Sequence, residues 1–128
     1  MDFKKIHHVA VICSNYEISK DFYINLLGLK VISEVYREDR QSYKLNLAVG
    51  DECEIELFSF PNAPKRLSYP EAVGLRHIAF CVEDLPKAVR HLLDCKIQVE
   101  PIRIDPLTEK KFTFFSDPDG LPIELYEA

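Results

Sequence analysis

The sequence lacks the features that mark several large classes of protein. It has no apolar run near the roughly 20 residues that a membrane-spanning helix needs, and its first residues lack the apolar core of a signal peptide. The 16 Lys and Arg residues against 21 Asp and Glu give a net charge of −5 and form no basic stripe that would neutralise phosphates. We therefore expect a cytoplasmic protein that binds neither membranes nor nucleic acids.

The sequence also lacks paired cysteines. Its four cysteines are widely separated, and none belongs to a C-x-x-C motif. In a cytoplasmic protein such cysteines are typically reduced and pack as small apolar side chains, so no disulfide framework is expected. With 128 residues, 47% of them hydrophobic and 29% charged, the chain has the length and composition of one globular domain, residues 1–128.

One His…Glu unit is present twice. The tripeptide Ile-Glu-Leu occurs two times, and its glutamates, Glu56 and Glu124, follow His8 and His77 by 48 and 47 residues. A repeat this regular indicates two copies of one structural module. Two imidazoles and two carboxylates are also a ligand set that suits a divalent metal ion. Fold and chemistry therefore depend on the same four residues.

The first copy has the pattern of a βαβββ module. An S-x-x-E capping box at Ser14 begins a helix that is expected to run to about Leu27. Ile18, Phe22 and Leu26 recur one turn apart, so they should form the buried stripe of that helix. Strands are expected at about 6–13, 30–37, 42–49 and 52–59.

The second copy repeats this pattern, with Asp84 as the expected N-cap of its helix. The modules then lie at about 5–60 and 75–127, joined by a proline-containing linker at 61–74. The fold class is α+β: two tandem βαβββ modules form a curved mixed sheet with a metal-binding cup on its strand face. Strands of the second copy are expected at about 75–82, 98–104, 111–115 and 121–126.

Strand alternation supports a polar face on these sheets. Glu56 and Phe58 share one side of their predicted strand, while Ile55 and Leu57 face the other side. A strand with apolar side chains towards the helix and a glutamate on the opposite face is typical of a sheet that lines a polar cavity.

Only one histidine of the His7-His8 pair is expected to face this cavity, because neighbours on a strand point to opposite sides. The repeat selects His8, since His-Val-Ala in the first copy aligns with His77-Ile-Ala in the second. Nitrogen and carboxylate ligands suit Ni, Co, Mn, Fe(II) or Zn, without deciding among them. The predicted ligands of one divalent metal ion are His8, Glu56, His77 and Glu124.

Five segments of the chain, which include the two His and the two Ile-Glu-Leu motifs, resemble the glyoxalase I family of the vicinal-oxygen-chelate (glyoxalase/bleomycin resistance/dioxygenase) superfamily. The resemblance covers the whole chain and implies paired βαβββ modules with a metal ion in the cup between them. Two His with two Glu is the glyoxalase I pattern, whereas extradiol dioxygenases and fosfomycin-resistance transferases keep one Glu. The segments that carry the resemblance are 8–11, 21–29, 55–57, 75–79 and 117–125.

The resemblance implies a lyase or isomerase of lactoylglutathione lyase type. Such an enzyme acts on a small α-oxo or hemithioacetal substrate, where a metal-stabilised enediolate passes a proton between adjacent carbons. Glu56 and Glu124 are then the catalytic residues, and Glu124 is the expected proton shuttle. Bacterial glyoxalase I enzymes hold glutathione with an Arg and an Asn where this chain has Ile12 and Phe60. Use of glutathione is therefore not expected to carry over.

The substrate contacts and the rival functions are less closely defined by the sequence. Arg37 and Arg103, which lie on predicted strands, meet either a substrate carboxylate or a surface ion-pair partner.

Two alternative functions stay open. One is another metal-dependent enzyme of the superfamily, an epimerase or dioxygenase, and the other is a non-catalytic binding protein of the bleomycin-resistance kind. A homodimer is expected, since short chains of this family commonly pair. Candidate substrate residues are Arg37, Phe58, Arg103 and Lys111.

Overall fold

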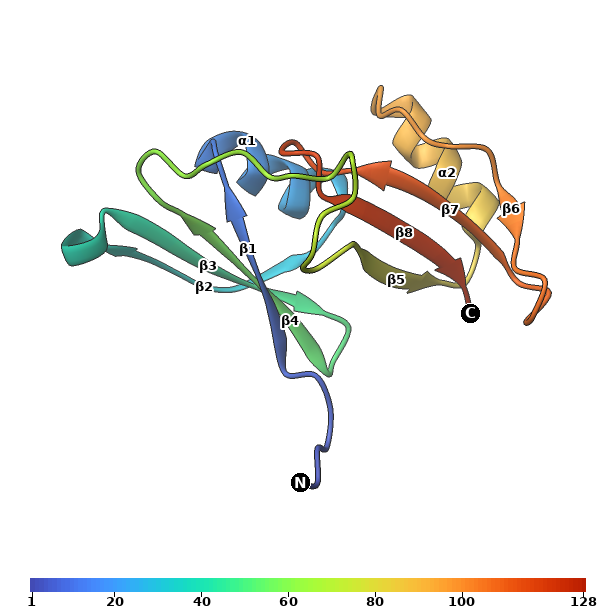
Figure 1. The fold of residues 1–128 in the computed structure, drawn as a ribbon, viewed down its shortest axis with the longest axis horizontal. Helices are drawn as coiled ribbons and strands as arrows, with labels where there is room; N and C mark the ends of the chain where they lie inside the picture. Colours follow the sequence, from blue (N-terminus) through green and yellow to red (C-terminus); the bar gives the residue numbers. More distant parts are fainter. The chain divides into compact units, whose positions relative to one another are not determined.

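The computed structural model describes all 128 residues, which group into two compact units, 1–65 and 66–128. Each unit contains one four-stranded mixed sheet and one helical segment between its first two strands (Figure 1). This arrangement confirms the predicted α+β class and the βαβββ order of each module. No helix is both long and apolar enough to span a membrane.

The sheet of the first unit has the strand order β1-β4-β3-β2. β1 runs parallel to β4, while β3 is antiparallel to both of its neighbours. A short 3-10 turn, η2 (Glu38–Arg40), joins β2 to β3. The strands are β1 (His8–Cys13), β2 (Lys30–Arg37), β3 (Ser42–Val49) and β4 (Cys53–Ser59).

The helical segment of the first unit begins later than the sequence indicated. Asn15, not Ser14, is the N-cap, and its side-chain oxygen accepts a hydrogen bond from the backbone N–H of Ile18 at 3.2 Å. The segment starts as an α-helix, α1 (Tyr16–Asp21), and ends as a π-helical turn, η1 (Phe22–Leu26).

The buried face of this segment also differs from the predicted stripe. Tyr16, Ser19 and Tyr23 are buried, together with Phe22, which the sequence did predict. Ile18 is 55% exposed, because it lies two positions after Tyr16 and therefore about 200° around the helix. The prediction was wrong for Ile18 because the buried stripe is centred on Tyr16, Ser19 and Tyr23, with Phe22 at its edge and Ile18 beyond it.

Alternation along β3 and β4 separates the core from a polar face. The apolar side chains of one face are completely buried, and each contributes about 1.5–3 kcal/mol by its removal from water. The other face carries Lys44, Asn46, Glu54, Glu56 and Phe58, as the alternation of the two strands requires. The buried core residues of these two strands are Leu45, Leu47, Ile55 and Leu57.

The second unit repeats the topology, with strand order β5-β8-β7-β6 and α2 (Leu85–Asp94) against one face of the sheet (Figure 1). Asp84 is the N-cap as predicted, because its Oδ1 accepts from the backbone N–H of Lys87 at 2.9 Å. Leu85 and Leu92 are its buried contacts. The strands are β5 (Ile78–Val82), β6 (Arg103–Ile104), β7 (Lys111–Ser116) and β8 (Pro122–Glu127).

Two predicted strands of this unit are shorter in the structure. β5 begins at Ile78 and β6 contains only Arg103 and Ile104. The segment before β6 is held instead by isolated hydrogen bonds: the N–H of Glu100 donates to the carbonyl of Phe114 at 2.9 Å. Its hydrophobic residues gave the pattern of a strand, but no continuous ladder forms there.

The segment from Arg66 onward is attached to the second unit. Ser68 Oγ donates to the carbonyl of Gly120 at 2.7 Å, and Arg66 Nη2 donates to the carbonyl of Arg76 at 3.1 Å.

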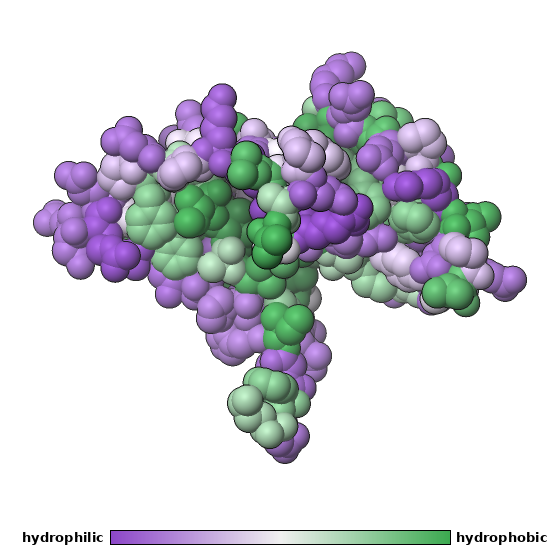
Figure 2. Space-filling model, viewed as in Figure 1, coloured by the Kyte–Doolittle hydropathy of each residue, from purple (hydrophilic) through white to green (hydrophobic).

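The four cysteines are free, as expected, although Cys81 and Cys95 are exposed rather than buried. Exposed apolar side chains also occur before β1, in the N-terminal segment at the lower end of Figures 1 and 2: Met1, Phe3 and Ile6.

Candidate functional site

The repeated motif forms a matching His–Glu pair in each unit. In the first unit His8 Nε2 lies 3.6 Å from Glu56 Oε2. In the second unit His77 Nε2 lies 3.0 Å from Glu124 Oε2. The glutamate side chains are 12% and 15% exposed, so both carboxylates are largely shielded from water.

Strand register explains why the same pair forms twice. Ala10 of β1 is paired with Glu56 of β4, and Ala79 of β5 is paired with Glu124 of β8. His8 lies two residues before Ala10 on β1, which is one full repeat of strand alternation, so it shares a face with Glu56. His77 directly precedes β5, and its 3.0 Å contact with Glu124 Oε2 places it on the corresponding face of the second sheet. The one-residue difference in sequence spacing is therefore taken up outside the paired strands.

The sequence predicted that His7 and His8 point to opposite faces of β1, but in the structure the two rings are in contact. β1 begins at His8, so strand alternation does not apply to His7. The two rings lie edge to face, with 2.9 Å between their Nδ1 atoms. His7 is therefore a neighbour of the pair, on the side of His8 that faces away from Glu56 Oε2.

The donor atoms of each pair are compatible with a shared metal ion. Two ligand atoms that are each about 2.1 Å from one ion, at angles of about 90–110°, lie about 3.0–3.4 Å apart. The observed separations of 3.0 and 3.6 Å are close to that range. Each pair has two donor atoms, and the structure contains no group of three or more His, Cys, Asp or Glu side chains suited to a metal.

Glu56 is held by donors from β3. Lys44 Nζ and Asn46 Nδ2 each lie 3.1 Å from Glu56 Oε1, and Asn46 also donates to Glu54 Oε2 at 3.0 Å. Burial raises the pKa of Glu56, but the hydrogen bonds from Lys44 and Asn46 and the charges of Lys44 and His8 outweigh it, so the pKa is lowered. The carboxylate is thus stabilised in its charged form.

Glu124 has aromatic neighbours instead. Phe114 of β7 is its cross-strand partner, in the register position that Asn46 has beside Glu56. The Phe114 ring meets the His77 ring edge to face, with centroids 5.1 Å apart. The ion-pair partner of Glu124 is His77. One carboxylate is thus fixed by a lysine and an amide, and the other by a histidine alone.

Arg37 and Phe58, two of the candidate substrate residues, lie together in the first unit. The Arg37 guanidinium is 4.9 Å from the Phe58 ring centroid, and its Nη2 donates to Ser42 Oγ at 3.0 Å. The Phe58 ring stacks on Phe60, which Arg40 also approaches to 5.9 Å. Phe60 is therefore part of an aromatic cluster whose rings are covered by the guanidinium groups of Arg37 and Arg40.

The other two candidates lie on different faces of the second sheet. Arg103 pairs with Phe112 across the ladder and covers its ring at 4.9 Å, on the face that carries Glu124. Lys111 shares the face of Thr113 and Phe115, which are buried in the core. Its Nζ is 3.6 Å from Glu127. The structure therefore does not bring Lys111 to the Glu124 face, because it is an odd number of residues away from Phe114.

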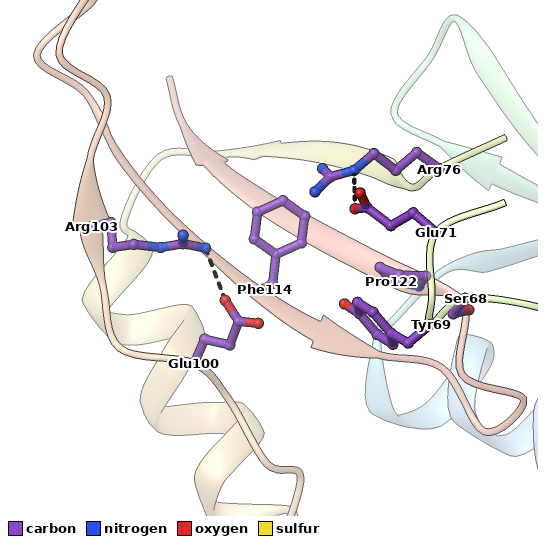
Figure 3. A pocket seen from close by; sticks show the side chains of 8 residues that line it. All are labelled: Ser68, Tyr69, Glu71, Arg76, Glu100, Arg103, Phe114 and Pro122. Carbon is purple, nitrogen blue, oxygen red and sulfur yellow. Dashed lines mark hydrogen bonds and ion pairs between the residues drawn. The ribbon is translucent and has the colours of Figure 1, made fainter. Parts of the chain in front are cut away.

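Sequence reasoning missed a cavity of about 170 Å³ in the second unit (Figure 3). It missed Lys44 and Asn46 as well, although Leu45 and Leu47 on the same predicted strand already indicated which face those two occupy. The cavity had no such signal, because its lining comes from four separate parts of the chain. These residues are Ser68, Tyr69, Glu71, Arg76, Glu100, Arg103, Phe114 and Pro122.

Comparison with known sequences identifies relatives along nearly the whole chain. The profile of the Glyoxalase/Bleomycin resistance protein/Dioxygenase superfamily matches residues 5–125. The uncharacterized protein YwkD of Bacillus subtilis (strain 168) is 60% identical over 127 residues, which cover 99% of each chain. The metallothiol transferase FosB of Staphylococcus saprophyticus is 29% identical over 129 residues, covering 96% of this chain and 76% of FosB.

Solved structures show the same fold. The glyoxalase family protein from Enterococcus faecalis matches with a TM-score of 0.90 and 49% identity, covering 99% of this chain and 100% of that one. The trypanothione-dependent glyoxalase I of Leishmania major matches with a TM-score of 0.74 and 25% identity, covering 98% of this chain and 87% of that one.

Proposed function

Because the chain belongs to the glyoxalase/bleomycin resistance protein/dioxygenase superfamily, we propose that it is a metal-dependent lyase or isomerase of glyoxalase I type. Its substrate is a small α-oxo compound or the hemithioacetal that such a compound forms with a thiol. One observation carries the proposal: the same His–Glu pair recurs in both modules, in the same register, with nitrogen–oxygen separations of 3.6 and 3.0 Å.

The four proposed metal ligands are His8, Glu56, His77 and Glu124. Two neutral imidazoles and two carboxylates balance the charge of a divalent cation and suit Ni, Co, Mn, Fe(II) or Zn. When bound, such an ion supplies a Lewis acid next to the substrate oxygens. We also propose a homodimer, which light scattering of the purified protein tests by its molar mass.

Glu124 is the proposed general base. Isomerisation moves one proton from a carbon beside a carbonyl to the carbonyl carbon itself, so it needs a carboxylate that can accept the proton and return it. Glu124 contacts His77, whereas Glu56 Oε1 is held by Lys44 and Asn46. The less restrained carboxylate is better suited to transfer the proton, and the restrained one is better suited to remain a ligand.

Glu124→Gln and Glu56→Gln distinguish these two roles. Each protein is reloaded with Ni, Co, Mn or Zn and assayed with methylglyoxal and a panel of low-molecular-weight thiols. We expect Glu124→Gln to lower kcat by about 10²–10⁴-fold, which is the typical contribution of a general base, while bound metal is largely retained. We expect Glu56→Gln to lower the bound metal more strongly than Glu124→Gln.

Glu127→Gln is the matched control, because Glu127 pairs with Lys111 on the other face of the same strand. It should leave both turnover and metal content unchanged. Full activity of Glu124→Gln would contradict the assignment of the base. Absence of isomerisation with every combination of metal and thiol would contradict the proposed function itself.

The likeness to FosB favours a second candidate, a metal-dependent enzyme that transfers a thiol to a small electrophile, since that relative is named a metallothiol transferase. Reactions that contain a thiol and a small epoxide in place of methylglyoxal test this second candidate by mass spectrometry. Attack of the thiol sulfur opens the epoxide and leaves a stable thioether adduct, whereas an isomerase leaves both reactants unchanged.

A further inference from the structure

The cavity of the second unit borders the His77–Glu124 pair. Phe114, in its wall, is the direct cross-strand partner of Glu124. Arg76, also in the wall, precedes His77 and places its Nη1 3.2 Å from His77 Nδ1. A substrate held by the proposed catalytic pair therefore has this cavity next to it, on the same face of the sheet.

The charged lining of the cavity is balanced. Arg76 Nε pairs with Glu71 Oε1 at 2.7 Å, and Arg103 Nη2 pairs with Glu100 Oε2 at 2.8 Å. In Figure 3 the Phe114 ring lies between the two arginines. All four charged side chains are half exposed, with 51–64% of their side-chain surface in contact with solvent. They are therefore accessible to a ligand.

Each arginine has donors left over for a ligand. A guanidinium carries five N–H donors, and the ion pairs occupy one nitrogen of Arg103 and one of Arg76. The Arg103 guanidinium is also fixed in place by the rings of Phe112 and Phe114, at 4.9 and 5.7 Å. A simple anion meets two carboxylates in this cavity, whereas a group with both charges finds a partner for each.

We propose that this cavity binds the zwitterionic, amino-acid-type end of the substrate, with its carboxylate on Arg103 and Arg76 and its ammonium on Glu100 and Glu71. The volume of about 170 Å³ is below the roughly 300–1,000 Å³ of a pocket for a drug-sized ligand, so it suits one small end group. The inference rests on the proposed function for the reactive end of that substrate. It places the amino-acid group of a thiol, or a free amino acid, beside Glu124.

Binding is tested on the metal-free protein by ¹H–¹⁵N NMR titration, following the Arg103 and Arg76 side-chain Nε–H signals and the Phe114 amide. The probes are S-methyl-L-cysteine, L-serine, propionate and propylamine. We expect saturable shifts with both amino acids and none with propionate or propylamine at the same concentrations. If L-serine binds more weakly than S-methyl-L-cysteine, the site recognises the amino-acid end of a thiol. If the two bind equally, the site recognises the amino-acid group alone.

Arg103→Gln should weaken binding of S-methyl-L-cysteine by about tenfold, as expected for the loss of a hydrogen bond between charged groups. Arg90→Gln, on the exposed surface of α2, is the matched control and should bind as the native protein does. Glu100→Gln removes an ammonium partner and frees Arg103, so propionate should now bind. Equal binding of propionate and S-methyl-L-cysteine to the native protein, or unchanged binding by both Arg103→Gln and Glu100→Gln, would overturn the proposal.

This experiment is independent of turnover. Glu124→Gln should bind S-methyl-L-cysteine like the native protein, because Glu124 is not in the cavity lining. If isomerisation fails with every thiol but zwitterion binding holds, the proposed function falls and the binding site stands. If isomerisation occurs but no zwitterion binds, the proposed binding site falls and the proposed function stands.

Discussion

Replacing Lys44 by Met should raise the pKa of Glu56 and destabilise the metal-free protein at neutral pH. Lys44 Nζ is 3.1 Å from Glu56 Oε1, and its hydrogen bond is the strongest of the influences that lower this pKa. A hydrogen bond to a charged group contributes about 1.5–3 kcal/mol. Because the Lys44 side chain is 34% exposed and screened by solvent, we expect a loss of about 1 kcal/mol.

The pH dependence has a definite sign. The folded pKa of Glu56 lies below its ordinary value of 4.5, so its contribution to stability is complete above the unfolded pKa. It is lost as the pH falls through the lower, folded pKa. Lys44→Met should therefore cost stability at pH 7, and the difference from the native protein should shrink when the pH falls below about 4.

Urea unfolding at pH 7 and pH 3 measures this difference, and ¹³C NMR of the Glu56 carboxyl measures its pKa directly. Lys111→Met is the matched control, because its ion pair with Glu127 is longer, at 3.6 Å, and the lysine is 45% exposed. It should cost less than about 0.5 kcal/mol. An unchanged Glu56 pKa in Lys44→Met, or an equal loss in the control, would refute the reasoning.

Two further predictions concern stability and are checked by urea or thermal unfolding. Leu57→Ala, at a fully buried site, should cost about 3 kcal/mol because burial is lost and a cavity is left. Ile18→Ala, at a side chain that is 55% exposed, should change stability by less than about 0.5 kcal/mol. Equal costs would contradict the observed helix face. Asn15→Ala should cost about 1 kcal/mol, because it removes the N-cap hydrogen bond to Ile18. A neutral result there would mean that another residue caps α1.

The parts of the fold that follow from short-range patterns could be predicted from the sequence. β2 and β3 have the predicted bounds, Lys30–Arg37 and Ser42–Val49, because alternation and the turn between them are local signals. Asp84 was likewise identified from a local capping pattern. The errors arose where tertiary contacts decide: which side of α1 meets the sheet, and whether the residues before Arg103 find a neighbouring strand.

The candidate site likewise has residues that the sequence predicted and residues that it could not predict. The repeat identified His8 and His77, and the structure shows the register that brings each next to its glutamate. Arg103 and Lys111 could not be separated from the sequence, because their faces depend on how β6 and β7 are paired. Arg76 and Glu71 were missed because their contact is made across a loop that has no periodic pattern.

The differences between the two modules carry more functional information than the motif that they share. The Ile-Glu-Leu repeat presents Glu56 and Glu124 as equivalent, and the strand register agrees. The neighbouring strands do not: Asn46 and Phe114 occupy the same register position beside their glutamates. The Asn46 amide donates a hydrogen bond to the Glu56 carboxylate, whereas the phenyl ring of Phe114 offers no donor to Glu124. Two glutamates that the motif presents as equivalent thus differ in the number of groups that hold them, through residues outside the repeated motif. The proposed division between ligand and base depends on that difference.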